Sequence, residues 1–142
     1  MIVVAVDSTT DLLSIAAGTV AGPLVTRSVE GARRHTRWLA PLAEEALGEM
    51  GATWADVEII AISDGPGSFT GLRVSAAWAK AVVRVGAVPL YSASTLLVRA
   101  AAGAAAGETV IGVGEALRGE LFAAGYRFHT GGIEELAAPR LV

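Results

Sequence analysis

The chain has 142 residues, of which 53% are hydrophobic and only 18% charged, with a formal net charge of −3. This length predicts one domain or slightly more, and the acidic balance disfavours binding to nucleic acid by the chain alone. The sequence has no cysteine, which excludes disulfides, thiolate metal sites and cysteine nucleophiles and favours a cytoplasmic protein. No apolar run is long enough to predict a membrane span.

The first half of the sequence predicts three strands followed by a helix. Residues 2–6, 12–17 and 24–29 are apolar runs of strand length, and the short turns between them predict an antiparallel meander. In the third run, Arg27 is expected to face water. The apolar residues within 36–50 recur at helical spacing, and an early proline at position 41 is tolerated if the helix starts near Arg37.

The second half alternates strands and helices. Residues 57–62 predict a strand, a glycine loop follows, and residues 72–85 predict a helix rich in alanine. This helix is apolar on nearly all sides, so we expect it to pack on its own sheet and on a second helix, which belongs to this chain or to another. Further elements are expected as a strand over 88–91, a helix over 95–106 capped by Ser92 or Ser94, strands over 109–113 and 121–128, and a short tail.

The glycine loop is the first candidate for a binding site. A strand, a glycine loop and a helix in succession present backbone N–H groups that favour an anion or a close partner backbone. However, a phosphate-binding P-loop has a lysine followed by serine or threonine after its last glycine, whereas Leu72 and Arg73 follow Gly71 here. The spacing of the glycines is also one residue too long for the dinucleotide-binding motif. The alternative is a tight turn that seats the helix against the strand.

Other polar residues each allow two interpretations. Asp7, Ser8 and Thr9 follow a buried strand and either face a metal-bound phosphate, as in actin-like kinases, or form a local turn. His35 has no second histidine at helical spacing, so a metal site is disfavoured relative to a structural hydrogen bond. The basic cluster Arg33, Arg34 and Arg37 binds phosphate or tRNA, or it is a solvated entrance to the helix.

The sequence from Gly65 to Arg73, GPGSFTGLR, closely resembles the signature of the TsaB family, also called YeaZ. That family is the non-catalytic partner in bacterial synthesis of threonylcarbamoyladenosine in tRNA. Residues 4–10, 35–41 and 92–96, and less closely 118–122, resemble further blocks of the family in the same order. The resemblance covers about residues 2–128.

The resemblance implies an α/β fold of the actin-like (ribonuclease H-like, ASKHA) type, with a mixed sheet, a three-strand meander, and then alternating helices and strands. Residues 1–106 are expected to form an N-terminal lobe and residues 107–142 the start of an incomplete second lobe. Family members are longer, and they usually have Asp-Ala-Arg where this chain has Glu115-Ala116-Leu117. The chain is therefore expected to be either a fragment or a natural short form.

The resemblance also implies a function without catalysis, cofactor or metal. The related enzyme TsaD carries paired histidines on the helix that corresponds to residues 36–50, where this chain has only His35. The implied partners are a TsaD-like catalytic subunit and a TsaE-like ATPase, with tRNA reached only through the complex and a homodimer formed by the isolated chain. Alternatives are an ATP-dependent enzyme of the actin-like class, with Asp7, Ser8 and Thr9 facing the nucleotide, and a glycoprotease. The residues expected at the partner interface are Gly65, Gly67, Ser68, Phe69, Thr70, Arg73, Ala76, Ala77 and Lys80.

Overall fold

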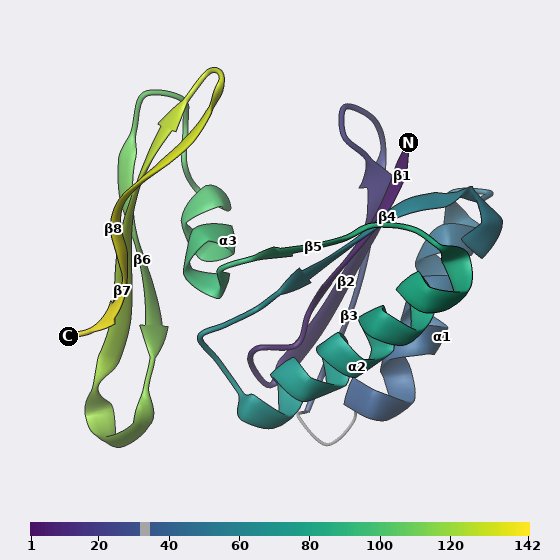
Figure 1. Ribbon diagram of the computed structural model, residues 1–142, viewed down its shortest axis with the longest axis horizontal. Coiled ribbons are helices and arrows are strands. Elements are labelled where there is room, and N and C mark those ends of the chain that lie inside the picture. Colours follow the sequence, from purple (N-terminus) through teal and green to yellow (C-terminus); the bar gives the residue numbers. More distant parts are fainter. Residues whose placement is uncertain (32–34) are drawn as a thin grey trace. The chain divides into compact units, whose positions relative to one another are not determined.

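The computed structural model describes residues 1–31 and 35–142. The chain divides into two compact units, and each is described by itself. The first unit comprises Met1–Asp64 and Ser68–Ser92, and the second comprises Gly65–Gly67 and Ala93–Val142. Figure 1 shows the helices and strands of both.

The first unit is built on a mixed sheet with the strand order β3-β2-β1-β4-β5. The predicted meander is confirmed, since β2 pairs antiparallel with both β1 and β3, and β4 then pairs parallel to β1. The strands are β1 (Ile2–Asp7), β2 (Leu12–Thr19), β3 (Leu24–Glu30), β4 (Val57–Ser63) and β5 (Leu90–Ala93).

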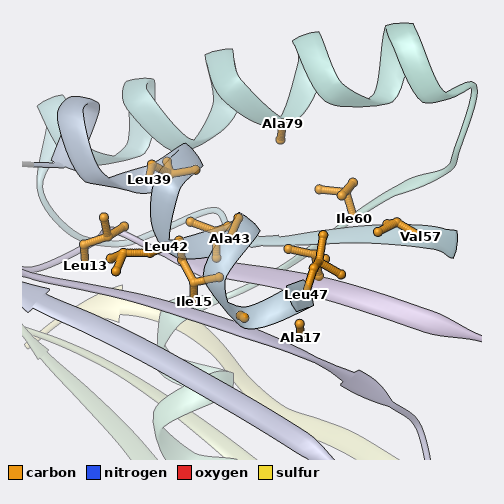
Figure 2. Packing of buried hydrophobic residues seen from close by; sticks show 13 residues of the cluster. Leu13, Ile15, Ala17, Leu39, Leu42, Ala43, Leu47, Val57, Ile60 and Ala79 are labelled. Atoms are coloured by element: carbon orange, nitrogen blue, oxygen red, sulfur yellow. The ribbon is translucent and has the colours of Figure 1, made fainter. Parts of the chain in front are cut away.

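Two helices, α1 (His35–Glu49) and α2 (Phe69–Gly86), cover one face of this sheet (Figure 1). Alternate residues of the strands and one side of α1 form the buried core between them, and Ala79 of α2 points into it (Figure 2). The strand residues reach this core because successive side chains in a strand point to opposite faces. A short 3₁₀ helix, η2 (Trp54–Asp56), precedes β4.

The expectation that Arg27 faces water is wrong. Arg27 is paired in register with the buried Ile15, so it lies on the face of the sheet that α1 covers. Its guanidinium forms ion pairs with Glu45, at 3.9 Å, and Glu49 on α1. The sheet edge thereby contacts the helix through charge as well as through apolar packing.

The second unit is a three-stranded antiparallel sheet packed on one short helix. Leu96 and Ala100 of this helix pack with Ala124, Tyr126 and Phe128. Its elements are α3 (Thr95–Ala101), β6 (Thr109–Glu115), η3 (Leu117–Gly119), β7 (Leu121–His129) and β8 (Gly132–Leu141).

The main differences from the prediction concern two helix boundaries and the C-terminal strand. Helix α2 starts at Phe69 rather than Leu72, because the Ser68 side chain accepts a hydrogen bond from the Gly71 N–H and caps it. The prediction that the next helix reaches residue 106 is wrong, since α3 ends at Ala101, before Gly103 and Gly107. The expected tail is in fact the edge strand β8, whose residues are all exposed. No helix within the described ranges is long and apolar enough to cross a membrane.

Candidate functional site

The start of α2 is held tightly against the turn that follows β1. The Ser8 hydroxyl donates a buried hydrogen bond of 2.8 Å to the Gly71 carbonyl, and the Ser68 N–H donates one of 2.7 Å to the Thr9 carbonyl. A Cβ at Gly71 would lie 1.8 Å from the Ser8 carbonyl oxygen, so only glycine permits this approach. The interpretation of the loop as a turn that seats the helix is confirmed at Gly71.

The side chains that were candidates for facing a phosphate are engaged locally. One carboxylate oxygen of Asp7 accepts hydrogen bonds from the Thr9 N–H, at 2.8 Å, and from the Thr9 hydroxyl, at 2.7 Å. Ser8 and Thr9 are buried, and Asp7 is half-buried. The hydrogen bonds of Asp7 with Thr9 form a local turn, which was the alternative to the interpretation that Asp7, Ser8 and Thr9 face a metal-bound phosphate.

His35 is 2% exposed, and its Nε2 lies 3.2 Å from the Asp11 carbonyl oxygen. The interpretation of His35 as a structural hydrogen-bonding residue is confirmed. Of the predicted basic cluster, Arg33 and Arg34 lie outside the described residues, and Arg37 stacks at 5.7 Å over the Trp38 ring. Residues 1–31 and 35–142 contain no group of three or more acidic or histidine side chains placed to hold a metal ion.

The predicted interface residues fall on both units. Gly65 and Gly67 belong to the second unit, where the Gly65 carbonyl accepts a hydrogen bond from the Thr95 N–H. The others belong to the first unit, in which Ser68 caps α2 and Ala76 is half-buried. The remaining five are exposed and form what we call the outer face of α2: Phe69, Thr70, Arg73, Ala77 and Lys80.

The outer face of α2 is opposite the side that packs on the sheet, where Gly71, Ser75 and Ala79 are buried. At its N-terminal end the Arg73 guanidinium stacks over the Phe69 ring at 5.5 Å, and that ring is 72% exposed. Because this face is exposed, the second helix expected to cover it stays a prediction. An exposed aromatic ring stacked with an arginine is typical of a surface that a partner contacts, because aromatic residues and arginine are enriched at interfaces.

Beside Ala77 the surface is hollowed, with a volume of about 470 Å³. We call this the first hollow, and it is lined by Thr36, Thr70, Arg73, Val74, Ala77 and Trp78. The Trp78 ring packs edge-to-face on Trp54, with 5.8 Å between the ring centroids. Neither tryptophan was predicted as part of the site, because the two are far apart in the sequence. The only sequence signal was the helical spacing that places Trp78 beside Val74.

Comparison with known proteins gives matches over most of the chain. A family model described as "TsaD: tRNA N6-adenosine threonylcarbamoyltransferase" matches residues 29–142. An uncharacterized protein of Mycobacterium tuberculosis is 36% identical over 95 residues, which are 67% of this chain and 44% of that protein. The tRNA threonylcarbamoyladenosine biosynthesis protein TsaB of Escherichia coli is 32% identical over 68 residues, 48% of this chain and 29% of that protein.

A tRNA N6-adenosine threonylcarbamoyltransferase of Agrobacterium fabrum is 42% identical over 65 residues, 46% of this chain and 18% of that protein. The chain thus spans less than half the length of these curated relatives. Among solved structures, YeaZ from Pseudomonas aeruginosa superimposes with a TM-score of 0.86 at 24% identity, over 99% of this chain and 67% of that one. This likeness confirms the predicted actin-like α/β fold.

Proposed function

Because the chain belongs to the family of tRNA N6-adenosine threonylcarbamoyltransferases (TsaD) and resembles its TsaB (YeaZ) members, we propose that it is a non-catalytic subunit of that system. It binds a TsaD-type catalytic subunit in the cytoplasm and supports transfer of the threonylcarbamoyl group to adenosine 37 of tRNA. Contact with tRNA, and with a TsaE-like ATPase, is made through that complex.

The observation that carries the proposal is the exposed outer face of α2 beside the first hollow. The face combines the exposed Phe69 ring, a residue type enriched at interfaces, with a small exposed residue, Ala77, over which another backbone can pass closely. A charge introduced on this face would be buried unpaired when the partner binds, at a cost of several kcal/mol.

The hydrogen bonds of the polar residues that were candidates for a site favour a supporting role over catalysis. The hydroxyls of Ser8 and Thr9 and the carboxylate of Asp7 make hydrogen bonds within the fold. His35, at the start of the helix on which the resemblance places the paired histidines of TsaD, is buried against the Asp11 carbonyl. The buried Ser8 hydroxyl, which donates to the Gly71 carbonyl, thus serves to hold the fold together.

The test is co-expression with TsaD from the same organism, followed by size-exclusion chromatography. The unmodified chain should elute together with TsaD, and Ala77→Glu should elute apart from it while remaining folded. The matched control is Ala101→Glu, an equal change at an exposed position of α3, which should elute with TsaD. Separate elution of the unmodified chain and TsaD contradicts the proposal.

A further inference from the structure

The sheet of the first unit has one long free edge, which is strand β3. The strand order β3-β2-β1-β4-β5 leaves β3 and β5 at the two edges, and β5 has only four residues. Strand β3 has seven residues, and within the described ranges 1–31 and 35–142 it pairs with β2 alone. An unpaired edge of this length is a template on which another chain can add a strand.

The ladder with β2 identifies the backbone groups of β3 that face this free edge. In an antiparallel pair, residues that exchange hydrogen bonds alternate with residues that do not. The Gly31 N–H donates to the Asp11 carbonyl at 2.8 Å, in continuation of the ladder, so the odd-numbered residues of β3 bond to β2. The even-numbered residues therefore turn their N–H and C=O groups outward, and these residues are Leu24, Thr26, Ser28 and Glu30.

The outward carbonyl of Thr26 is occupied by the side chain of Arg27. The Nη1 of Arg27 donates a hydrogen bond of 2.8 Å to that carbonyl. The Nη2 of the same guanidinium donates to Glu49, and its Nε lies 3.9 Å from Glu45, both on α1. A guanidinium presents five donors in a planar fork, so one side chain can contact the helix and the strand edge together.

Apart from Arg27, β3 has the composition of a strand that pairs readily. From Leu24 to Val29 the sequence is LVTRSV, in which Arg27 is the one charged residue and valine and threonine favour strands. Proteins protect such edges with inward-pointing charges, because an added strand would bury the charge. Arg27 has this position, since it is paired in register with the buried Ile15 on the face that α1 covers.

We propose that Arg27, held by Glu45 and Glu49, is an autoinhibitory contact that keeps β3 from pairing with β3 of a second copy of the chain. Full antiparallel overlap of two copies of β3 is centred on residue 27, so it would place the two arginines directly opposite each other. Like charges in that position are destabilising. The added strand would also have to displace the guanidinium from the Thr26 carbonyl. The inference is independent of the proposed function, because β3 and α1 carry it rather than the outer face of α2.

The test compares Arg27→Met, which removes the guanidinium and keeps an unbranched side chain, with Arg27→Lys, which keeps the charge. Both changes are made in a parent chain that carries Ala77→Glu, so that association through the outer face of α2 does not contribute. Sedimentation velocity measures self-association, and circular dichroism verifies the fold. We expect Arg27→Met to associate at a concentration at least about tenfold lower than the parent, and Arg27→Lys to stay within about twofold of the parent.

Backbone hydrogen exchange shows where the copies of Arg27→Met meet. The outward N–H groups of Thr26 and Ser28 should exchange at least about tenfold more slowly in the associated chain than in the parent. The N–H groups of Val25 and Val29, which already bond to β2, should not change. Adding Ser28→Pro should abolish the association, because proline removes an outward N–H and leaves the ladder with β2 in place.

Each other outcome overturns the inference. A folded Arg27→Met chain that associates no more than its parent shows that Arg27 does not protect the edge. Association that Ser28→Pro leaves unchanged shows that the copies meet elsewhere. If Arg27→Met does not fold, Arg27→Thr replaces it, since threonine favours strands. If neither neutral variant folds, Arg27 is required for the fold itself, and the inference is wrong.

Discussion

Substitution of Gly71 by alanine tests how α2 is seated on the turn after β1. The added Cβ would lie 1.8 Å from the Ser8 carbonyl oxygen, well inside a normal contact, so the two backbones must separate. Overpacking of this kind costs about 1–3 kcal/mol. The separation also weakens the buried hydrogen bond from the Ser8 hydroxyl to the Gly71 carbonyl, worth about 0.5–1.5 kcal/mol. Against this, alanine is favoured over glycine within a helix by about 1 kcal/mol.

The net expectation for Gly71→Ala is a loss of about 0.5–3.5 kcal/mol in the free energy of unfolding. The matched control is Gly48→Ala in α1, where an added Cβ meets nothing within 4 Å, and it should stabilise by up to about 1 kcal/mol. Urea unfolding followed by tryptophan fluorescence suits the purpose, because Trp38, Trp54 and Trp78 all lie in the first unit. Equal stability of the two variants would refute the close contact between Gly71 and Ser8.

Three further expectations follow from the structure. Hydrogen bonds from the Thr53 N–H and hydroxyl lower the pKa of Asp56 below its ordinary value of 3.8. A carboxyl with a lowered pKa stabilises the fold above its ordinary pKa, and this stabilisation is lost as the pH falls through the folded pKa. The difference in stability between the unmodified chain and Asp56→Asn should therefore shrink below pH 3.8, which acid titrations followed by fluorescence would measure. The purified chain should not turn over ATP, because Asp7, Ser8 and Thr9 are engaged in native hydrogen bonds; robust ATP hydrolysis that Asp7→Ala abolishes would be contrary to the account. The isolated chain should self-associate at high micromolar concentration through the outer face of α2, and a clean monomer in sedimentation would count against this.

The order of the elements could be predicted from local sequence, because each depends on a local pattern. The β-branched runs gave β1 and β4, and the helical spacing of apolar residues gave α1. What failed depended on partners distant in the sequence. Arg27 looked like a solvent-facing residue of a strand, but it pairs with Glu45 and Glu49 on a helix that follows later in the chain. The strand β8 was missed because Pro139 and the absence of alternation hide an exposed edge strand.

The candidate site was predictable only in part. Ala77 was predicted as an interface residue because α2 is rich in small residues, and it lies on an exposed face of the helix. The first hollow beside it depends on Thr36 of α1, which approaches α2 only when the first unit folds. The partner of Gly71 could not be predicted either, because the contact that requires glycine is with Ser8, sixty-three residues earlier.

The central claim is tested most directly by measuring threonylcarbamoyladenosine in tRNA by mass spectrometry. TsaD from the same organism would be supplied with tRNA and a threonylcarbamoyl donor, alone or with the chain or its Ala77→Glu variant. The account predicts that the chain raises the yield of modified adenosine, that the variant does not, and that the chain without TsaD yields none. Equal yields with and without the chain, or modification by the chain alone, would contradict the account.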